Sequence, residues 1–273
     1  MKKNPIGVFD SGVGGLSVLR EIRALLPAQP VYYFADQAHV PYGSRQIEEV
    51  RAFSHGITRY LLELGARLIV VACNTASVAS LSSLREEYPD IPFVGMEPAV
   101  KPAAEQSLSG RVGVLATEAT FHTDMYASVV ERFARDVIVL EDPCPGLVAQ
   151  VEKGDLTGGQ TRLILEKAID PMLAAGVDTI VMGCTHYPFV IPLIQSIVGP
   201  DVRVIDPAPA IARQTRRMLE AHGLLADGKR RSVTKYITSG EAGSFQKILR
   251  QLINEKRPVK QVTWQDGTVV DLA

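Results

Sequence analysis

The chain has 273 residues, of which 46% are hydrophobic and 22% are charged, as in a globular protein of one large or two ordinary domains. A formal net charge of −1, from 29 basic and 30 acidic residues, argues against a general nucleic-acid-binding or membrane-surface-binding protein. No apolar run is long enough to span a bilayer, the N-terminus lacks a secretory apolar core, and the three cysteines lack the spacing of a disulfide framework. We therefore expect free thiols in a reducing cytoplasm.

The first part of the chain alternates short apolar runs with segments of helical spacing. Strands are expected at residues 6–10, 31–35, 68–73 and 91–95. Helices are expected at residues 16–26, 47–64 and 75–88. This alternation predicts an α/β fold with a mostly parallel sheet.

The same alternation restarts near residue 112. Strands are expected at residues 112–115, 137–140, 179–184 and 202–205, and helices at residues 121–133 and 159–174. Beyond residue 207, helices are expected at residues 210–221 and 245–254, and strands at residues 233–239 and 259–264. The pattern alone does not assign this last segment to either part of the chain.

Two short phrases occur twice in the chain. Residues 68–75 return as residues 179–186, so that Cys73 matches Cys184 at an offset of 111 residues. Residues 6–11 return as residues 112–117, at an offset of 106 residues. Two phrases repeating at nearly one period indicate a duplicated α/β unit. Each copy carries one cysteine at the carboxyl end of a strand, where open α/β sheets bind ligands.

The two matched cysteines suggest acid–base chemistry. Either one alone is well explained as a small buried hydrophobic residue, which is common for free cysteine. A thiol with a reference pKa of about 8.5 acts as a base when deprotonated and as an acid when protonated. A reaction that inverts a centre needs one group of each kind, on opposite faces of the substrate. The pair Cys73 and Cys184 is therefore our candidate for such a reaction.

A glycine-rich turn at residues 10–15 follows the first strand and opens a helix. Its backbone N–H groups can bind an anion at the positive end of that helix. The alternative is a tight turn in which Asp10 or Ser11 caps the helix. The carboxylate of Asp10 can also orient or deprotonate a thiol on a neighbouring strand end.

Polar residues follow each matched cysteine directly. Asn74 and Thr75 follow the first, and Thr185 and His186 follow the second. Their amide, hydroxyl and imidazole groups suit the carboxylates and ammonium of an amino acid, although Asn and Thr are also common helix caps. A cysteine beside a histidine also occurs in zinc sites and thiol hydrolases. We find no further zinc ligands, and a hydrolase leaves Cys73 unexplained.

Three other residues have a functional and an ordinary interpretation. Tyr42, followed by Gly43, lies in a loop after a strand, where polar groups often line a site, but loop packing explains it equally. Glu152 lies in a helix, where an exposed carboxylate is the ordinary case. Cys144 has no match in the first part of the chain, and we interpret it as structural.

Four motifs in order, at residues 7–16, 41–43, 72–76 and 183–188, resemble the glutamate racemases, the cofactor-independent branch of the Asp/Glu racemase family. The resemblance implies interconversion of L- and D-glutamate without cofactor or metal, and a supply of D-glutamate for peptidoglycan synthesis. It implies a cytoplasmic homodimer with no nucleic-acid or membrane partner. Some members bind a cell-wall precursor through an N-terminal extension. We do not expect that regulation here, because the first strand begins at residue 6.

The resemblance also implies an architecture of two pseudo-symmetric α/β domains with mostly parallel sheets facing a central cleft. Residues 1–97 and 208–273 would form the first domain, with the C-terminal segment returning to it. Residues 98–207 would form the second.

Roles for individual residues follow from the resemblance. Cys73 would remove the α-proton on one face, and Cys184 would deliver a proton on the other. Asp10 would assist the first thiol, and Glu152 and His186 the second. The matching substrate contacts are Asp10, Ser11, Tyr42, Gly43, Asn74, Thr75, Thr117, Thr120, Thr185 and His186.

Two alternatives to this function remain at the level of sequence. A racemase of aspartate or another small acidic amino acid would use the same two thiols. A non-catalytic amino-acid-binding module would use the same architecture without proton transfer.

Overall fold

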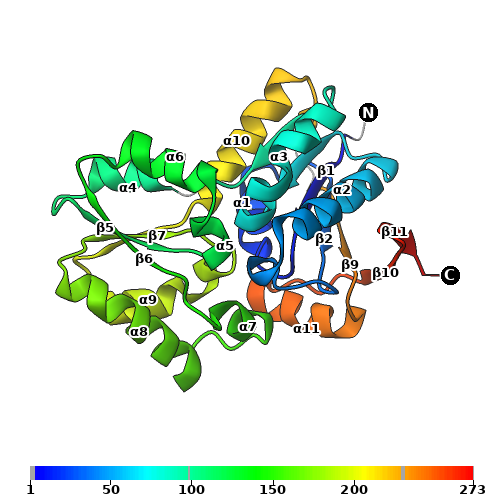
Figure 1. Ribbon diagram of the computed structural model, residues 1–273. Helices are drawn as coiled ribbons and strands as arrows, with labels where there is room; N and C mark the ends of the chain where they lie inside the picture. The colour runs from blue at the N-terminus through cyan, green and yellow to red at the C-terminus, as the bar shows by residue number, and fades with distance from the viewer. Residues whose placement is uncertain (1–3, 98, 229–230, 273) are drawn as a thin grey trace. The chain divides into compact units, whose positions relative to one another are not determined.

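The computed structural model describes residues 4–97, 99–228 and 231–272, and their contacts divide the chain into two compact units (Figure 1). Unit 1 comprises Met1–Met96 and Ala208–Ala273, and unit 2 comprises Glu97–Pro207. Pro98, at which the expected second domain begins, lies outside the described residues. Within the described ranges, no helix is long and apolar enough to cross a membrane.

Unit 1 is built on a seven-stranded sheet in the order β11-β10-β9-β2-β1-β3-β4. Its strands are β1 (Ile6–Asp10), β2 (Val31–Ala35), β3 (Leu68–Val71), β4 (Phe93–Gly95), β9 (Thr234–Thr238), β10 (Val259–Gln265) and β11 (Thr268–Asp271). Its helices are α1 (Leu16–Leu25), α2 (Ile47–Glu63), α3 (Asn74–Glu87), α10 (Ala208–Ala221) and α11 (Ala242–Ile253), with a short 3-10 helix η1 (Tyr42–Ser44). Neighbouring strands are parallel except for the antiparallel pair β10 and β11.

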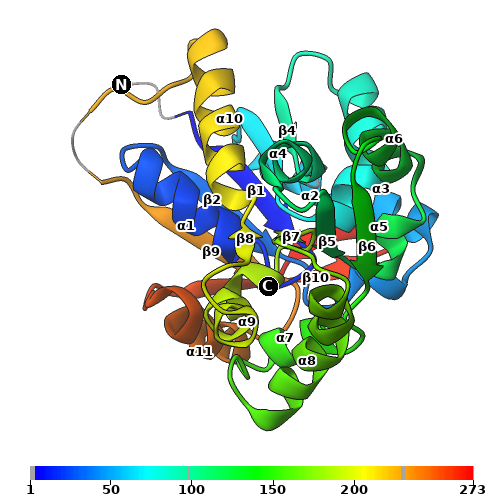
Figure 2. The same cartoon turned by 90° about the vertical axis from the view of Figure 1, so that its left-hand side faces the viewer.

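The sheet of unit 1 is buried between helices, as its continuous apolar strands require. Every residue of β1 and β3 is buried. Helices α2 and α3 pack together and share one apolar core with Phe9, Ile69 and Val71. Helices α1 and α10 lie side by side (Figure 2), and α1 buries Leu16, Leu19 and Ile22. The C-terminal strands β9 and β10 therefore extend a sheet that the first hundred residues begin.

The final strand β11 is absent from the sequence-based expectation, which ended at residue 264. Residues 265 and 268 pair across a two-residue turn, in which φ is +47° at Asp266 and +74° at Gly267. Positive φ at both central residues is the geometry of a type I′ hairpin turn, for which Asp-Gly is a favoured sequence. That dipeptide was the signal that could have predicted the hairpin.

Unit 2 is a four-stranded, fully parallel sheet in the order β6-β5-β7-β8. Its strands are β5 (Arg111–Leu115), β6 (Ile138–Asp142), β7 (Thr179–Met182) and β8 (Arg203–Ile205). Its helices are α4 (Val100–Gln106), α5 (Glu118–Phe121), α6 (Asp124–Phe133), α7 (Leu147–Glu152), α8 (Gly159–Ala174) and α9 (Ile191–Val198), with a 3-10 helix η2 (Tyr187–Val190). Helices α4 and α6 pack together, as do α8 and α9 (Figure 1).

The helix expected at residues 121–133 corresponds to α6, which begins three residues later, and the short helix α5 precedes it. Thr123 separates the two helices, since its hydroxyl accepts a hydrogen bond from the backbone N–H of Tyr126 at 3.2 Å and caps α6. Threonine is a preferred cap because its side chain satisfies an N–H group that the helix leaves unpaired.

The two units repeat one topology. The order β2-β1-β3-β4 in unit 1 matches β6-β5-β7-β8 in unit 2. Ile6 pairs with Leu68, and the residues 106 and 111 positions later, Val112 and Thr179, pair in the same register. The predicted α/β fold with two pseudo-symmetric units and mostly parallel sheets is confirmed.

We predict that Gly267→Ala lowers the free energy of unfolding by about 1–2 kcal/mol, because an L-residue is strained at φ +74°. No atom lies within 4 Å of an added Cβ there, so the cost is conformational. Gly159→Ala is the control, because an added Cβ is equally unobstructed in helix α8, where alanine is favoured. Urea unfolding of both variants measures the difference. Equal midpoints would contradict the assigned turn.

Candidate active site

Cys73 lies just beyond β3, at the start of α3. It is the N-cap of that helix, in an extended conformation, and its Sγ accepts a hydrogen bond from the backbone N–H of Ala76 at 3.4 Å. The residue is 5% exposed. A sulfur that accepts a backbone hydrogen bond at the positive end of a helix is in a setting that stabilises negative charge.

Asp10 ends the neighbouring strand β1 and is fully buried. Its Oδ1 accepts a hydrogen bond from the N–H of Gly12 at 2.8 Å, so the carboxylate fixes the glycine-rich turn rather than capping α1. A Cβ at Gly15 would lie 2.7 Å from Asp10 Cβ and 3.2 Å from Ala72 Cβ. Glycine there lets α1 start directly against the ends of β1 and β3. Ser11, in the same turn, is also buried.

Asn74 is buried, yet its side chain has no partner in the part of the chain that the structure describes. Both Oδ1 and Nδ2 lack a hydrogen bond there. The capping role considered for Asn74 is wrong, because Cys73 is the cap and Asn74 is the first residue of the helix. Burial of an unbonded amide costs about 1–3 kcal/mol. Such a group beside Cys73 is available to a polar ligand, and Thr75 next to it is buried as well.

Tyr42 begins η1 and is buried, with Gly43 half-buried after it. Its hydroxyl donates to Asp36 Oδ2 at 2.6 Å. Burial, then the charge and hydrogen bond of Asp36, raise the pKa of Tyr42 well above its usual value, and the charges of Cys73 and Asp10 add to this. The phenol is therefore a protonated donor directed at Asp36, close enough to Cys73 and Asp10 to interact with their charges.

Cys184 lies just beyond β7 in unit 2, in the position that Cys73 has in unit 1. The N–H of Ala72 donates to the Phe9 carbonyl at 2.7 Å, and the N–H of Gly183 donates to the Leu115 carbonyl at 2.7 Å. Each cysteine follows directly after such a bond. Cys184 is 6% exposed, and Thr185 beside it is buried.

His186 connects Cys184 to Glu152. Its Nδ1 lies 3.8 Å from Cys184 Sγ, and its Nε2 lies 2.6 Å from Glu152 Oε1. Burial lowers the pKa of His186, but the hydrogen bonds and charges of Cys184 and Glu152 outweigh it and raise the pKa well above its usual value. The ordinary interpretation of Glu152 as an exposed helical carboxylate is wrong, because α7 ends with this side chain bound to His186.

Two further buried residues, Tyr187 and Cys144, interact electrostatically with Cys184. The hydroxyl of Tyr187 donates to the Pro143 carbonyl at 3.0 Å, and burial followed by the charge of Cys184 raises its pKa well above the usual value. Cys144 is buried, and burial followed by the charge of Asp142 raises the pKa of its thiol. A neutral, buried thiol agrees with the structural interpretation of Cys144. Tyr187 lies within the motif at residues 183–188, but the sequence gave it no role of its own.

Thr117 and Thr120 lie close together after β5. Their Oγ1 atoms are 3.0 Å apart, and Thr120 is fully buried. Thr117 in unit 2 is equivalent to Ser11 in unit 1, because each follows directly after the equivalent residues Ala116 and Asp10. Among residues 4–97, 99–228 and 231–272, no group of three or more His, Cys, Asp or Glu side chains is arranged to hold a metal ion.

Comparison with known proteins shows the family to which this chain belongs. The family model described as Asp/Glu/Hydantoin racemase matches residues 6–215. The chain is 51% identical over 245 residues to a glutamate racemase of Pseudomonas paraeruginosa, covering 90% of this chain and 92% of the relative.

Solved structures match over nearly the whole chain. Glutamate racemase isoform RacE1 from Bacillus anthracis is 31% identical with a TM-score of 0.87, covering 98% of this chain and 100% of the other. Escherichia coli glutamate racemase, solved with L-glutamate and the activator UDP-MurNAc-ala, is 32% identical with a TM-score of 0.84, covering 98% and 100%. The chain therefore belongs to the Asp/Glu/Hydantoin racemase family, and within it to the glutamate racemases, which are isomerases.

Proposed function

We propose that this chain interconverts L- and D-glutamate by transferring protons through Cys73 and Cys184. The observation that carries the proposal is the placement of these two thiols at equivalent positions beyond the equivalent strands β3 and β7, each among buried polar groups. The substrate is proposed because the relatives are glutamate racemases and because the Escherichia coli enzyme was solved with L-glutamate.

In the proposed reaction, one cysteine starts as a thiolate and the other as a thiol. The thiolate takes the α-proton and becomes a thiol, while the other thiol delivers its proton to the opposite face of the α-carbon and becomes a thiolate. The product is the enantiomer, and the reverse reaction exchanges the roles. No cofactor takes part in these steps.

The α-proton of an amino acid is only weakly acidic, so the carbanion needs fixed donors close to the substrate carboxylate. We propose that the unbonded amide of Asn74 is one of them. The further proposed contacts are Asp10, Ser11, Tyr42, Gly43, Thr75, Thr117, Thr120, Thr185 and His186.

The assisting groups differ between the two thiols. We propose that Asp10, on the strand beside Cys73, orients the first thiol and accepts or returns its proton. For Cys184, we propose that protonated His186, supported by Glu152, donates a hydrogen bond to the thiolate. The physiological role would be the supply of D-glutamate for peptidoglycan synthesis, by a homodimer in the cytoplasm.

We predict that Cys73→Ala and Cys184→Ala each lower racemisation of glutamate by about 10²–10⁴-fold or more, because each removes one of the two proton carriers. Circular dichroism follows the loss of optical activity from L- and D-glutamate, and NMR in D₂O follows exchange at the α-carbon. Cys144→Ala is the control and should retain the wild-type rate.

Three outcomes would refute parts of the proposal. Wild-type racemisation by either cysteine variant would remove the two-thiol mechanism. Faster racemisation of aspartate than of glutamate by the native chain would change the substrate. Binding of glutamate without α-carbon exchange would show a binding module instead of an enzyme.

Glu152→Gln should move the alkaline limb of the kcat/KM profile to lower pH. The charge of Glu152 helps to raise the pKa of His186, so its removal lets the imidazolium lose its proton at lower pH. Rates measured across pH in both directions give the limb. Glu166→Gln is the control, because Glu166 and its partner Arg162 form an ion pair between exposed side chains of α8. An alkaline limb at the wild-type pH would contradict the proposed support of His186 by Glu152.

Asn74→Ala should raise KM for glutamate about 10-fold without lowering the free energy of unfolding. Its amide makes no hydrogen bond within the described protein, so the fold loses none with it, whereas the substrate loses one. Ser77→Ala in the same helix is the contrast, since its hydroxyl binds the Val71 carbonyl and the Met96 N–H and its loss should destabilise the fold. An Asn74→Ala protein that is destabilised and has an unchanged KM would contradict this prediction.

A further inference from the structure

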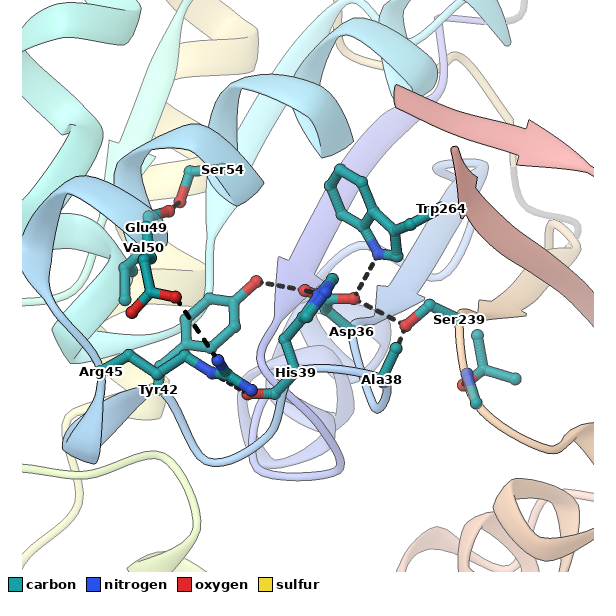
Figure 3. A network of polar contacts seen from close by, with 12 residues as sticks. Asp36, Ala38, His39, Tyr42, Arg45, Glu49, Val50, Ser54, Ser239 and Trp264 are labelled. Carbon is teal, nitrogen blue, oxygen red and sulfur yellow. Dashed lines mark hydrogen bonds and ion pairs between the residues drawn. The ribbon is translucent and has the colours of Figure 1, made fainter. Parts of the chain in front are cut away.

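Asp36 is the residue directly after β2, and it is fully buried. Four polar side-chain groups lie within hydrogen-bond distance of its carboxylate (Figure 3). Ser239 Oγ donates to Oδ1 at 2.6 Å, and Trp264 Nε1 donates to Oδ1 at 2.8 Å. Tyr42 Oη donates to Oδ2 at 2.6 Å, and His39 Nδ1 lies 2.9 Å from Oδ2. No pattern in the sequence had singled out Asp36.

These partners come from three separate segments of unit 1. His39 and Tyr42 belong to the loop after β2, Ser239 follows β9, and Trp264 belongs to β10, 228 residues after Asp36. Ser239 is held in place by a hydrogen bond from the Ala38 N–H at 3.0 Å and by its own N–H, which donates to the Ala35 carbonyl at 3.1 Å. The C-terminal segment is therefore bonded to the loop that carries Tyr42.

The indole of Trp264 is fixed by packing as well. Its ring meets His39 edge-on at 5.2 Å between centroids, and His39 stacks on Phe53 at 3.8 Å. A Cβ at Gly56 would lie 2.7 Å from the indole, so α2 accepts this ring only because glycine stands there. Small movements of Trp264 are thus restricted, and its N–H is aimed at one carboxylate oxygen.

The carboxylate of Asp36 has no acceptor capacity left for substrate. Two oxygens offer about four lone-pair sites, and four polar groups occupy them. A buried carboxylate is stable only when its charge is compensated in this way. Asp36 is therefore suited to hold other groups in place.

The group that it holds closest to the candidate site is Tyr42. This residue shares an apolar core with Cys73 and Phe34, and η1 packs against α3, the helix that Cys73 caps. A shift of Tyr42 and Gly43 would therefore change the packing around Cys73.

We propose that Asp36 is a positioning residue, through which Trp264 and Ser239 of the C-terminal segment hold the Tyr42–Gly43 turn in its substrate-binding position beside Cys73. This inference rests on the proposed function. It assigns the last strands of unit 1 a role in substrate affinity, although they contribute no proposed substrate contact themselves.

The test compares two conservative variants, each of which removes one hydrogen bond made by a residue of the C-terminal hairpin. Trp264→Phe removes the N–H donor to Asp36 and keeps an aromatic ring. Tyr60→Phe is the matched control, because it removes a hydrogen bond of 2.6 Å to Asp271 in the same hairpin and leaves Asp36 untouched. We expect Trp264→Phe to raise KM for glutamate about 3- to 10-fold, with kcat within about twofold and an unchanged pH profile. Tyr60→Phe should keep the wild-type KM.

Two further variants test the same role of Asp36 independently of Trp264. Ser239→Ala removes the other donor to Oδ1 and should raise KM in the same way, which decides the matter if Trp264→Phe fails to fold. Asp36→Asn should raise KM more than either. A loss of kcat together with a limb of the pH profile in Asp36→Asn would identify a proton carrier and overturn the positioning role.

The two proposals fail in different ways. A native chain that does not racemise glutamate refutes the proposed function. A racemising native chain whose Trp264→Phe and Ser239→Ala variants keep the KM of Tyr60→Phe refutes the inference about Asp36.

Discussion

The candidate site depends on the register of two parallel strand pairs. Phe9 pairs with Val71 in unit 1, and Leu115 pairs with Met182 in unit 2. Residues just beyond these pairs meet at the carboxyl edge of each sheet, which is where parallel α/β sheets bind ligands. A slip of one residue would turn each cysteine to the opposite face of its sheet, because side chains alternate along a strand. The apolar strands that oppose such a slip therefore also determine where the candidate site lies.

The repeated scaffold carries two different acid–base settings. Asp10 in unit 1 corresponds to Ala116 in unit 2, and Thr75 corresponds to His186. The first thiol therefore has a carboxylate on its neighbouring strand, and the second has an imidazole that Glu152 supports from α7. Enantiomers have equal free energies, so kcat/KM in a racemase is the same in both directions. The difference between the two settings can appear only in kcat and KM taken separately.

The sequence predicted those parts of the fold that depend on a local pattern of residues. The echo between residues 68–75 and 179–186 located the equivalent strands, and alternation predicted parallel sheets. What it missed depended on distant partners. Asp36 is an ordinary loop residue in sequence, since Ser239 and Trp264 join it from more than 200 positions away. Glu152 resembled an exposed helical carboxylate until the fold brought His186 to it. A role of Asp10 beside a neighbouring thiol was considered from the residues themselves, whereas the expectation that Glu152 assists Cys184 came only from the family resemblance.

Asp36 and Asn74 show how buried polar groups divide between architecture and ligand binding. Both are buried in unit 1: Asn74 follows Cys73 directly, and Asp36 accepts a hydrogen bond from Tyr42, which shares an apolar core with Cys73. The carboxylate of Asp36 is fully compensated by protein groups, so it stabilises the arrangement in which it lies. The amide of Asn74 is not, so it reduces stability until a ligand supplies the missing bonds.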